Sequence, residues 1–522
     1  MGLYLNPSNR GFAASLRSEI YVDKTGIIAY TNKVLDTQQR YICISRPRRF
    51  GKTMAAEMLS AYYSRGCDSR RMFQNLAAAK ETSFENQLNK YNVVYLNMQE
   101  FLTKYHNVGV MIKKITDRVN RDILEEYHDF DFSFADDLSD SLQALFKLSE
   151  IPVIFIIDEW DCIFRDHKAD KTAQKAYLDF LRNLLKDRVY ITLAYMTGIL
   201  PIKKYGTHSA LNMFREFSMT DPRELAEFTG FTQNEVITLC DEYNMDYEEM
   251  AAWYDGYHFS DIQRVYNPKS VVEALLSGKF SNYWSQTETF EALSVYIKMN
   301  FDGLRDTIIE LLAGVKQFID IRTFTNDMIT FESSDDVLTL LVHLGYLGYD
   351  FETQEIFIPN KEISDEFVSA IKTTGWNEIS KALKSSNDLL KATWRQDSLF
   401  VAQAIEHAHN ETSIIKYNDE NALSCVLSIA YYSARQYYNI HREMPAGKGF
   451  ADLVFLPRKN HLDKPPMIVE LKWDKSAEGA IRQTEEKNYA DILSDYKDNA
   501  LLIGINYDKV SKKHECIIKL MA

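Results

Sequence analysis

Short apolar runs alternate with longer stretches of helical spacing up to about Leu200. The runs are apolar throughout instead of alternating with polar residues, which is typical of strands buried on both faces of a parallel sheet. The helical stretches between them complete the order expected of an α/β fold. The pattern therefore predicts an α/β domain with a parallel sheet, whose strands we expect at residues 41–44, 93–96, 153–157 and 190–195.

From about Pro222 to Leu390 the pattern is mostly helical, with one exception. Residues 336–344 have helical spacing, and two short apolar runs follow at 346–349 and 356–358. A helix that leads into a two-stranded hairpin is typical of a winged helix. Such an element could read DNA, act as a lid or contact a partner, and the pattern leaves these roles open.

The last hundred or so residues return to a mixed α/β pattern after a helical connector at 387–408. Apolar runs of strand length alternate here with amphipathic stretches of helix length. We expect a helix at 420–438, strands at 451–456 and 467–471, a helix at 477–493 and a strand at 500–505.

Composition is ordinary for a soluble globular protein, with 46% hydrophobic and 26% charged residues. No run approaches the ~18 apolar residues of a membrane helix, and the first residues lack a basic segment followed by an apolar stretch. We therefore expect neither a membrane span nor a secretory signal. The six cysteines have no Cys-x-x-Cys spacing, which argues against a zinc site or a disulfide framework and favours a reducing cytoplasm.

Charge gives no clear indication of a nucleic-acid partner. The net charge of −14 argues against one, because phosphate contacts need Lys and Arg. From residue 413 onward, however, 16 Lys and Arg stand against 15 Asp and Glu, so this segment is close to neutral. Charge therefore neither supports nor excludes binding to DNA or RNA.

A candidate nucleotide site follows the first predicted strand. In a phosphate-binding loop (P-loop), backbone N–H groups and a lysine hold the phosphates, and a Ser or Thr hydroxyl binds Mg²⁺. Arg46 stands where such a loop usually has its first glycine, and its Cβ restricts the backbone there, so the strict pattern fails. We nevertheless expect nucleotide contacts from Arg48, Arg49, Phe50, Gly51, Lys52 and Thr53.

A second motif favours this interpretation. The buried strand at 153–157 ends in Asp158-Glu159, and α/β sheets bind ligands at the carboxyl ends of their strands. We expect Asp158 and Thr53 to hold the Mg²⁺ of ATP and Glu159 to polarise the attacking water. Taken alone, Asp158-Glu159 could merely begin a loop, and Lys52 could be a solvated lysine at the start of a helix. Their order on one chain favours the nucleotide site.

Thr197, after the strand at 190–195, could sense the γ-phosphate, although a threonine at a strand end is more often a cap. Arg48, Arg49 and Arg215 are candidates for an arginine finger, and the sequence does not choose among them.

A candidate metal site lies near the carboxy-terminal end. Hydrolysis of a phosphodiester with Mg²⁺ needs converging carboxylates and a lysine that orients water or stabilises charge. Glu470 and Lys472 alternate on one predicted strand and so share a face, and a glycine turn delivers Asp452 beside them. The Leu471 carbonyl and Glu420 would complete the metal ligands. An exposed strand face with one ion pair is the alternative interpretation.

Several short motifs stand out along the chain: SRPRRFGKT at 45–53, YVDKT at 21–25, IIDE at 156–159, TGI at 197–199, WYDGY at 253–257 and YNP at 266–268. Together they resemble those of a bacterial AAA-ATPase-like family that carries a PD-(D/E)XK nuclease-type domain at its carboxyl end. The resemblance spans essentially the whole chain and implies that Arg46 is usual at its position. It also adds Gln483, which resembles the catalytic glutamine common in the nuclease superfamily.

These observations predict three domains. We expect a P-loop AAA-ATPase-like domain with a parallel sheet at 1–220, a helical lid and winged-helix-like region at 221–390, and a PD-(D/E)XK-like α/β core at 391–522. A chain of 522 residues is too long for one hydrophobic core, which agrees with such a division.

The leading functional hypothesis is an Mg-ATP-dependent ATPase coupled to a nuclease, in which nucleotide gates the Mg²⁺-dependent cleavage of DNA or RNA. One alternative is a nucleotide-switched interaction module whose nuclease-like core binds a partner without cleavage. Another is a degraded ATPase lobe beside an active nuclease, which intact Lys52 and Asp158-Glu159 disfavour. The sequence does not give the oligomeric state.

Overall fold

Contacts within the chain, seen in a computed structural model, divide it into two compact units that are discontinuous in sequence. One comprises Met1–Gln286 and Phe318–Ile363, and the other Thr287–Gln317 and Ser364–Ala522. The three predicted domain boundaries stay a prediction. The structure describes residues 2–128, 137–202, 204–205, 208–209, 211–259, 262–284, 290–326, 328–373, 377–411, 420–446, 449–458, 461–486 and 499–521.

A five-stranded sheet in which all neighbouring strands run parallel is the framework of the first unit. Its order, β2-β3-β4-β1-β7, confirms the predicted α/β fold with a parallel sheet. Every residue of β1, β3 and β4 is buried, which explains their apolar runs. The strands are β1 (Tyr41–Ser45), β2 (Asn92–Asn97), β3 (Val153–Asp158), β4 (Ile191–Gly198) and β7 (Arg215–Phe217).

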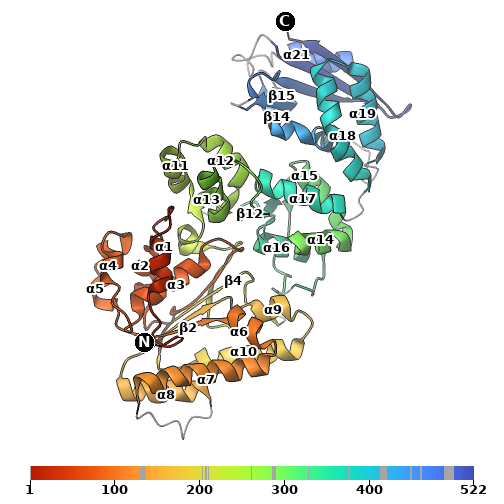
Figure 1. The fold of residues 1–522 in the computed structure, drawn as a ribbon. Coiled ribbons are helices and arrows are strands. Elements are labelled where there is room, and N and C mark those ends of the chain that lie inside the picture. The colour runs from red at the N-terminus through yellow and green to blue at the C-terminus, as the bar shows by residue number, and fades with distance from the viewer. Residues whose placement is uncertain are drawn as a thin grey trace. The chain divides into compact units, whose positions relative to one another are not determined.

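Helices cover both faces of this sheet, with α1 to α5 on one side and α6 to α10 on the other (Figure 1). The first face packs on a core that joins strand residues such as Ile42 and Ile154 to Phe12, Ile28 and Tyr62 of the helices. The elements are α1 (Arg10–Leu16), α2 (Ile27–Val34), α3 (Lys52–Tyr63), α4 (Arg70–Phe73), the 3₁₀ helix η1 (Ala77–Lys80), α5 (Phe84–Gln87), α6 (Met98–Tyr105), α7 (Val108–Glu126), α8 (Leu138–Ser149), α9 (Cys162–Asp166) and α10 (Lys171–Leu185).

The rest of the first unit is mainly helical, as its pattern predicts, but includes short strands that the pattern does not reveal. The predicted helix and hairpin are present as α16 (Ser334–Leu344), β12 (Gly348–Asp350) and β13 (Glu355–Phe357), with β12 and β13 antiparallel. The other elements are β5 (Lys204–Tyr205), β6 (His208–Ser209), η2 (Arg223–Phe228), β8 (Phe231–Thr232), α11 (Gln233–Glu242), α12 (Tyr247–Tyr254), β9 (Tyr257–Phe259), β10 (Ile262–Tyr266) and α13 (Pro268–Ser277).

A mixed five-stranded sheet of order β14-β15-β16-β17-β18 is the framework of the second unit. Only β16 and β17 are parallel neighbours in it. The pattern predicts the three central strands but misses both edge strands. In β18, exposed residues alternate with buried ones, so it lacks the continuous apolar run by which the central strands were predicted. The strands are β14 (Tyr438–Ala446), β15 (Gly449–Pro457), β16 (Met467–Trp473), β17 (Leu501–Asp508) and β18 (Lys513–Leu520).

The helices of the second unit differ from expectation mainly at their ends. The helix expected at 420–438 stops at Ala430 and gives way to a short 3₁₀ helix. The helix expected at 477–493 runs to Glu486, and its remainder lies outside the described residues. The elements are α14 (Phe290–Met299), η3 (Phe301–Gly303), α15 (Leu304–Leu312), α17 (Lys361–Thr373, in which the division between the units falls), α18 (Asn377–Trp394), α19 (Ser398–Glu411), α20 (Glu420–Ala430), η4 (Tyr432–Gln436) and α21 (Ala477–Glu486).

In the part of the chain that the structure describes, no helix is long and apolar enough to cross a bilayer.

Candidate phosphate and metal sites

The loop between β1 and α3 turns without a glycine at its first position. Gly51 (φ 84°) and Arg49 (φ 70°) adopt the left-handed conformation, whereas Arg46 is not among the residues with positive φ. A Cβ is costly where the backbone is left-handed. The backbone conformation therefore does not require a glycine at position 46, and the left-handed position directly before Lys52 is a glycine, Gly51.

Arg46 is fully buried, and its side chain connects the loop to neighbouring strands. Its Nη1 donates to the carbonyl oxygens of Ser45 and Phe217, both at 2.9 Å, and its guanidinium carbon lies 4.8 Å from the ring centroid of Phe259. Burial lowers the pKa of Arg46 to about 9, so it stays charged at neutral pH. The side chain therefore links the end of β1 to β7 and β9.

Lys52 is the first residue of α3, and its side chain turns back to the loop that precedes the helix. Its Nζ donates to the carbonyl oxygens of Arg46 (2.9 Å) and Pro47 (2.8 Å), and the side chain is buried. Burial lowers the pKa of Lys52, while the nearby carboxylates of Glu159 and Asp158 act to raise it. The ammonium thus binds main-chain carbonyls instead of a carboxylate, next to the loop N–H groups that would face a phosphate.

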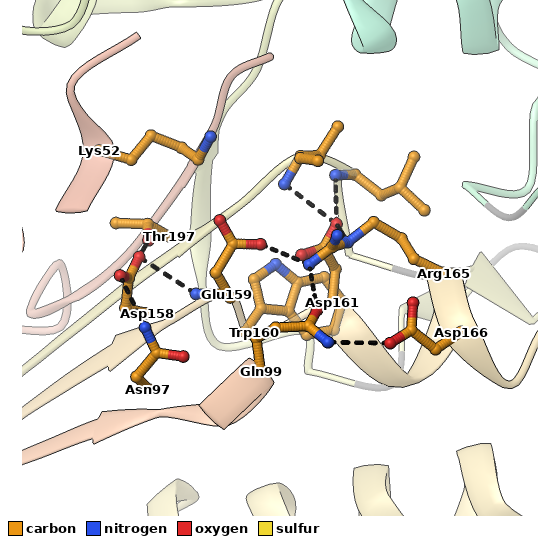
Figure 2. A network of polar contacts seen from close by, with 12 residues as sticks. Lys52, Asn97, Gln99, Asp158, Glu159, Trp160, Asp161, Arg165, Asp166 and Thr197 are labelled. Atoms are coloured by element: carbon orange, nitrogen blue, oxygen red, sulfur yellow. Dashed lines mark hydrogen bonds and ion pairs between the residues drawn. The ribbon is translucent and has the colours of Figure 1, made fainter. Parts of the chain in front are cut away.

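Asp158 collects polar partners from three elements at the carboxyl edge of the sheet. Thr53 Oγ1 donates to Oδ2 at 2.8 Å. Thr197 Oγ1 donates to Oδ1, and Asn97 Nδ2 lies 3.4 Å from Oδ2 (Figure 2). The structure thus brings together Thr53, Asp158 and Thr197, which the sequence singles out. Asn97 was missed, although its position directly after the predicted strand at 93–96 could have indicated it.

Glu159 is held by an arginine that the sequence did not single out. Its backbone is left-handed (φ 54°), and its carboxylate forms an ion pair with Arg165 of α9. Arg165 also lies 3.3 Å from Asp161 Oδ2 and donates to Gln99 Oε1 at 3.1 Å. Burial raises the pKa of Glu159, against the lowering effect of Arg165 and Lys52. The i, i+4 spacing of Asp161 and Arg165 is the one signal that could have indicated the pair.

Other predicted residues of this site have different surroundings. Phe50 is buried with its ring centroid 5.3 Å from that of Tyr257, so it packs in the core beside the loop. Arg49 is exposed and Arg48 is half-buried. Arg215 pairs with Glu224 at 2.8 Å. The roles of Arg48, Arg49 and Phe50 toward nucleotide, and of Arg215 as a finger, stay predictions.

In the second unit, four predicted residues meet beside β16. Asp452 Oδ2 accepts from the backbone N–H of Leu471 at 2.7 Å, and Gln483 Nε2 of α21 donates to Glu470 Oε1. Lys472 Nζ lies 3.0 Å from Glu470 Oε1 and 2.8 Å from the Leu471 carbonyl oxygen. The side chains of Lys472 and Glu470 are only 9% and 2% exposed, which excludes a solvated strand face.

The donor set suits a hard divalent cation, because carboxylate and carbonyl oxygens are the ligands that Mg²⁺ prefers. Two of these expected ligands, Glu470 Oε1 and the Leu471 carbonyl, bind the Lys472 ammonium instead. Among the described residues no group of three or more His, Cys, Asp or Glu could hold a metal ion. Glu420 begins α20, but its side chain lies outside the described residues.

Comparison with known families finds one match toward each end of the chain. Residues 14–207 match the family described as "Predicted AAA-ATPase", and residues 418–516 match the "PD-(D/E)XK nuclease superfamily". The chain therefore has an AAA-ATPase-like domain on its amino-terminal side and a PD-(D/E)XK nuclease superfamily domain on its carboxy-terminal side, which confirms the resemblance seen in the motifs.

Individual relatives are distant. Over 285 residues the chain is 24% identical to the "Uncharacterized protein in vnfD 5'region" of Azotobacter chroococcum mcd 1, covering 52% of this chain and 51% of that relative, so it spans about half of that protein's length. The Aeropyrum pernix ORC2 protein, solved in ADPNP–ADP complexes, is 12% identical with a TM-score of 0.29, covering 70% of this chain and 98% of ORC2. Cdc6p of Pyrobaculum aerophilum is 11% identical with a TM-score of 0.24, covering 71% and 99%. These scores are too low to support conclusions about this chain.

Proposed function

We propose that the amino-terminal domain binds and hydrolyses Mg-ATP. The observation that carries this proposal is the convergence of Thr53, Thr197 and Asn97 on Asp158, beside the loop that contains Lys52. Parallel α/β sheets bind ligands at this edge. A phosphate bound at the loop would accept hydrogen bonds from the N–H groups of the loop and from the Lys52 ammonium. To reach the phosphate, the ammonium would leave the carbonyls of Arg46 and Pro47.

Thr53 and Asp158 are the residues that would hold Mg²⁺. The bound ion would neutralise the negative charge that develops on the phosphates during hydrolysis. Glu159, the next residue, would accept a proton from the attacking water and orient it. Its carboxylate is suited to this role because it is largely buried and stands on the Asp158 side of Arg165 (Figure 2).

The test of this proposal is the hydrolysis of ATP by the full chain and by Glu159→Gln. The variant keeps the shape of the side chain but removes the base, so we expect nucleotide affinity within about twofold of wild type and a kcat lower by about 10²–10⁴-fold. Glu125→Gln, at an exposed position of α7, is the control and should hydrolyse normally. Wild-type turnover by Glu159→Gln would contradict the role of Glu159.

For the carboxy-terminal domain we propose Mg²⁺-dependent hydrolysis of a nucleic-acid phosphodiester, gated by the nucleotide on the first domain. Support comes from the meeting of Asp452, Glu470, Lys472 and Gln483 beside β16, where Glu470 and Lys472 are buried. Asp452, Glu470 and the Leu471 carbonyl would hold the ion, which lowers the pKa of a bound water. Lys472 would stabilise charge on the phosphate after leaving Glu470.

The corresponding assay uses single-stranded DNA, double-stranded DNA and RNA with Mg²⁺ or Mn²⁺, with and without ATP. We expect cleavage that depends on nucleotide state and disappears in Asp452→Ala and Glu470→Ala. Equal cleavage with and without ATP would contradict the gating and leave the nuclease activity in place.

A second candidate is a nucleotide-switched interaction module that binds a partner without cleavage. The ion pair of Lys472 with Glu470 favours it, because the ammonium binds two of the atoms that a metal would need. ATP-dependent binding of nucleic acid or protein without cleavage of any of the three substrates would establish this candidate over the nuclease.

A further inference from the structure

Arg165 is buried among three polar partners next to the proposed catalytic carboxylate. Its Nη2 donates to Glu159 Oε2 and, at 3.1 Å, to Gln99 Oε1, while Nε lies 3.3 Å from Asp161 Oδ2. Only 7% of its side chain is exposed. Within the described part of the chain, Arg165 is the only residue whose side chain bonds to the Glu159 carboxylate.

The partners of Arg165 are themselves fixed. Asp161 is fully buried, and its Oδ2 accepts from the backbone N–H groups of Ile199 (3.0 Å) and Leu200 (2.8 Å), which follow β4. Gln99 also donates to Asp166 Oδ2 at 2.9 Å. The guanidinium is therefore held by the sheet edge on one side and by α6 on the other, so it offers Glu159 a nearly immobile partner.

The positive charge on Arg165 does not change with pH in the range of an assay. Burial acts to lower the pKa of Arg165, but the carboxylates of Asp161 and Glu159 outweigh it and raise the value above that of a free arginine. The guanidinium therefore remains protonated at every pH at which the protein would be assayed.

We propose that Arg165 is a positioning residue for ATP hydrolysis, which holds one oxygen of Glu159 so that the carboxylate stays directed toward the phosphate loop. Figure 2 shows the Glu159 carboxyl group between Lys52 and Arg165, with Oε2 joined to Arg165. An unsupported glutamate samples several rotamers, and holding one oxygen removes that freedom before water arrives. Outer partners that orient metal ligands typically contribute 10- to 100-fold to affinity or activity, and we expect an effect of that order here. The inference rests on the proposed ATP hydrolysis at this site.

The experiment compares Arg165→Gln and Arg165→Lys with wild type in ATP hydrolysis and in binding of a fluorescent ATP analogue. For Arg165→Gln we expect kcat to fall by about 10- to 100-fold, while the Kd of the analogue stays within about twofold. Arg165→Lys restores a positive charge and should recover part of the loss. Arg182→Gln, at an exposed position of α10, is the control and should leave both quantities unchanged.

Two results would overturn the proposal. One is a wild-type kcat in Arg165→Gln. The other is a Kd weakened as much as kcat is lowered, because it would indicate that Arg165 only supports the fold. If Arg165→Gln does not fold, Gln99→Ala, which removes one support of the guanidinium, takes its place and should lower kcat by a smaller factor without changing Kd.

The role of Glu159 is tested separately. If Glu159→Gln hydrolyses ATP like wild type, the proposed base is wrong. If Glu159→Gln is stalled and Arg165→Gln is not, only the positioning role fails. In the Glu159→Gln background the change Arg165→Gln should cause no further loss of kcat, because Arg165 is proposed to act through that carboxylate alone.

Discussion

The two candidate sites place a buried lysine next to acidic residues, but they do so differently. Lys52 binds two main-chain carbonyls of its own loop, and Asp158 is held by hydroxyl and amide donors. Lys472 binds Glu470 directly. The first site therefore keeps its ammonium apart from the carboxylate proposed to bind metal, whereas the second pairs them. A phosphate that binds Lys52 would break only the hydrogen bonds of the ammonium to carbonyls, whereas a metal on Glu470 would break a buried ion pair.

The two units also differ in the protonation of the buried arginine and histidine side chains compared here. In the first unit Arg46 and Arg165 are buried and remain charged. In the second, His409 and His514 are buried in contact with each other, and burial lowers the pKa of His409 to about 3 and of His514 to about 4. The second unit thus keeps its buried imidazoles neutral, which ties its stability to pH.

The largest effect expected from this comparison is at Lys52. Lys52→Ala should weaken nucleotide binding by about 100-fold or more, because the lysine at this position of a phosphate-binding loop reaches the β- and γ-phosphates. Titration of the full chain with a fluorescent ATP analogue measures this loss. Lys80→Ala, an exposed lysine in the same domain, should bind like wild type. Wild-type affinity in Lys52→Ala would show that the loop does not bind the phosphates of the nucleotide as proposed.

The next effect concerns the histidine pair, whose Nδ1 and Nε2 atoms lie 2.7 Å apart. In the unfolded chain an imidazole binds a proton below about pH 6.5, whereas the folded pair does not until much lower pH. The stability contributed by the neutral pair is therefore fully present above pH 6.5 and is lost as the pH falls toward 4. At pH 5 we expect a loss of about 2 kcal/mol for each histidine.

Hydrogen exchange of α19 and β18 at pH 7.5 and pH 5, corrected for intrinsic rates, measures this loss. His514→Phe should reduce the pH dependence by about half, while His106→Gln, at an exposed position of the first unit, should leave it unchanged. Equal pH dependence in wild type and His514→Phe would show that the pair does not control acid stability.

The smallest effect has the opposite sign to that at Lys52. Lys472→Met removes the ammonium that competes for Glu470 Oε1 and the Leu471 carbonyl. We expect Mn²⁺ affinity to rise by about tenfold, or about 1.4 kcal/mol, while cleavage is lost. Calorimetric titration at pH 8 without nucleotide measures the affinity, and Glu470→Ala in the same background should remove the gain. Unchanged or weaker Mn²⁺ binding in Lys472→Met would show that the ion pair does not oppose the metal.

Much of both sites could be predicted because it depends on strand geometry. Parallel strands meet at one edge, so the ends of the strands at 153–157 and 190–195 bring Asp158 and Thr197 together. Alternation along one strand places Glu470 and Lys472 on the same face. The family motifs added Gln483, which lies on a helix and has no such geometric signal.

The sequence by itself determined the order of the main strands and helices, the buried character of β1, β3 and β4, and the edge of the sheet to which Asp158 and Glu159 belong. Only the tertiary structure decided that Arg165 holds Glu159, that Arg46 lies beneath the loop against Phe259, and that Lys472 folds back onto Glu470. The physical reason is that periodicity fixes the direction of a side chain but not its rotamer or its partner. Those depend on residues distant in sequence: Thr53 lies 105 residues from Asp158, and Phe217 lies 171 residues from Arg46.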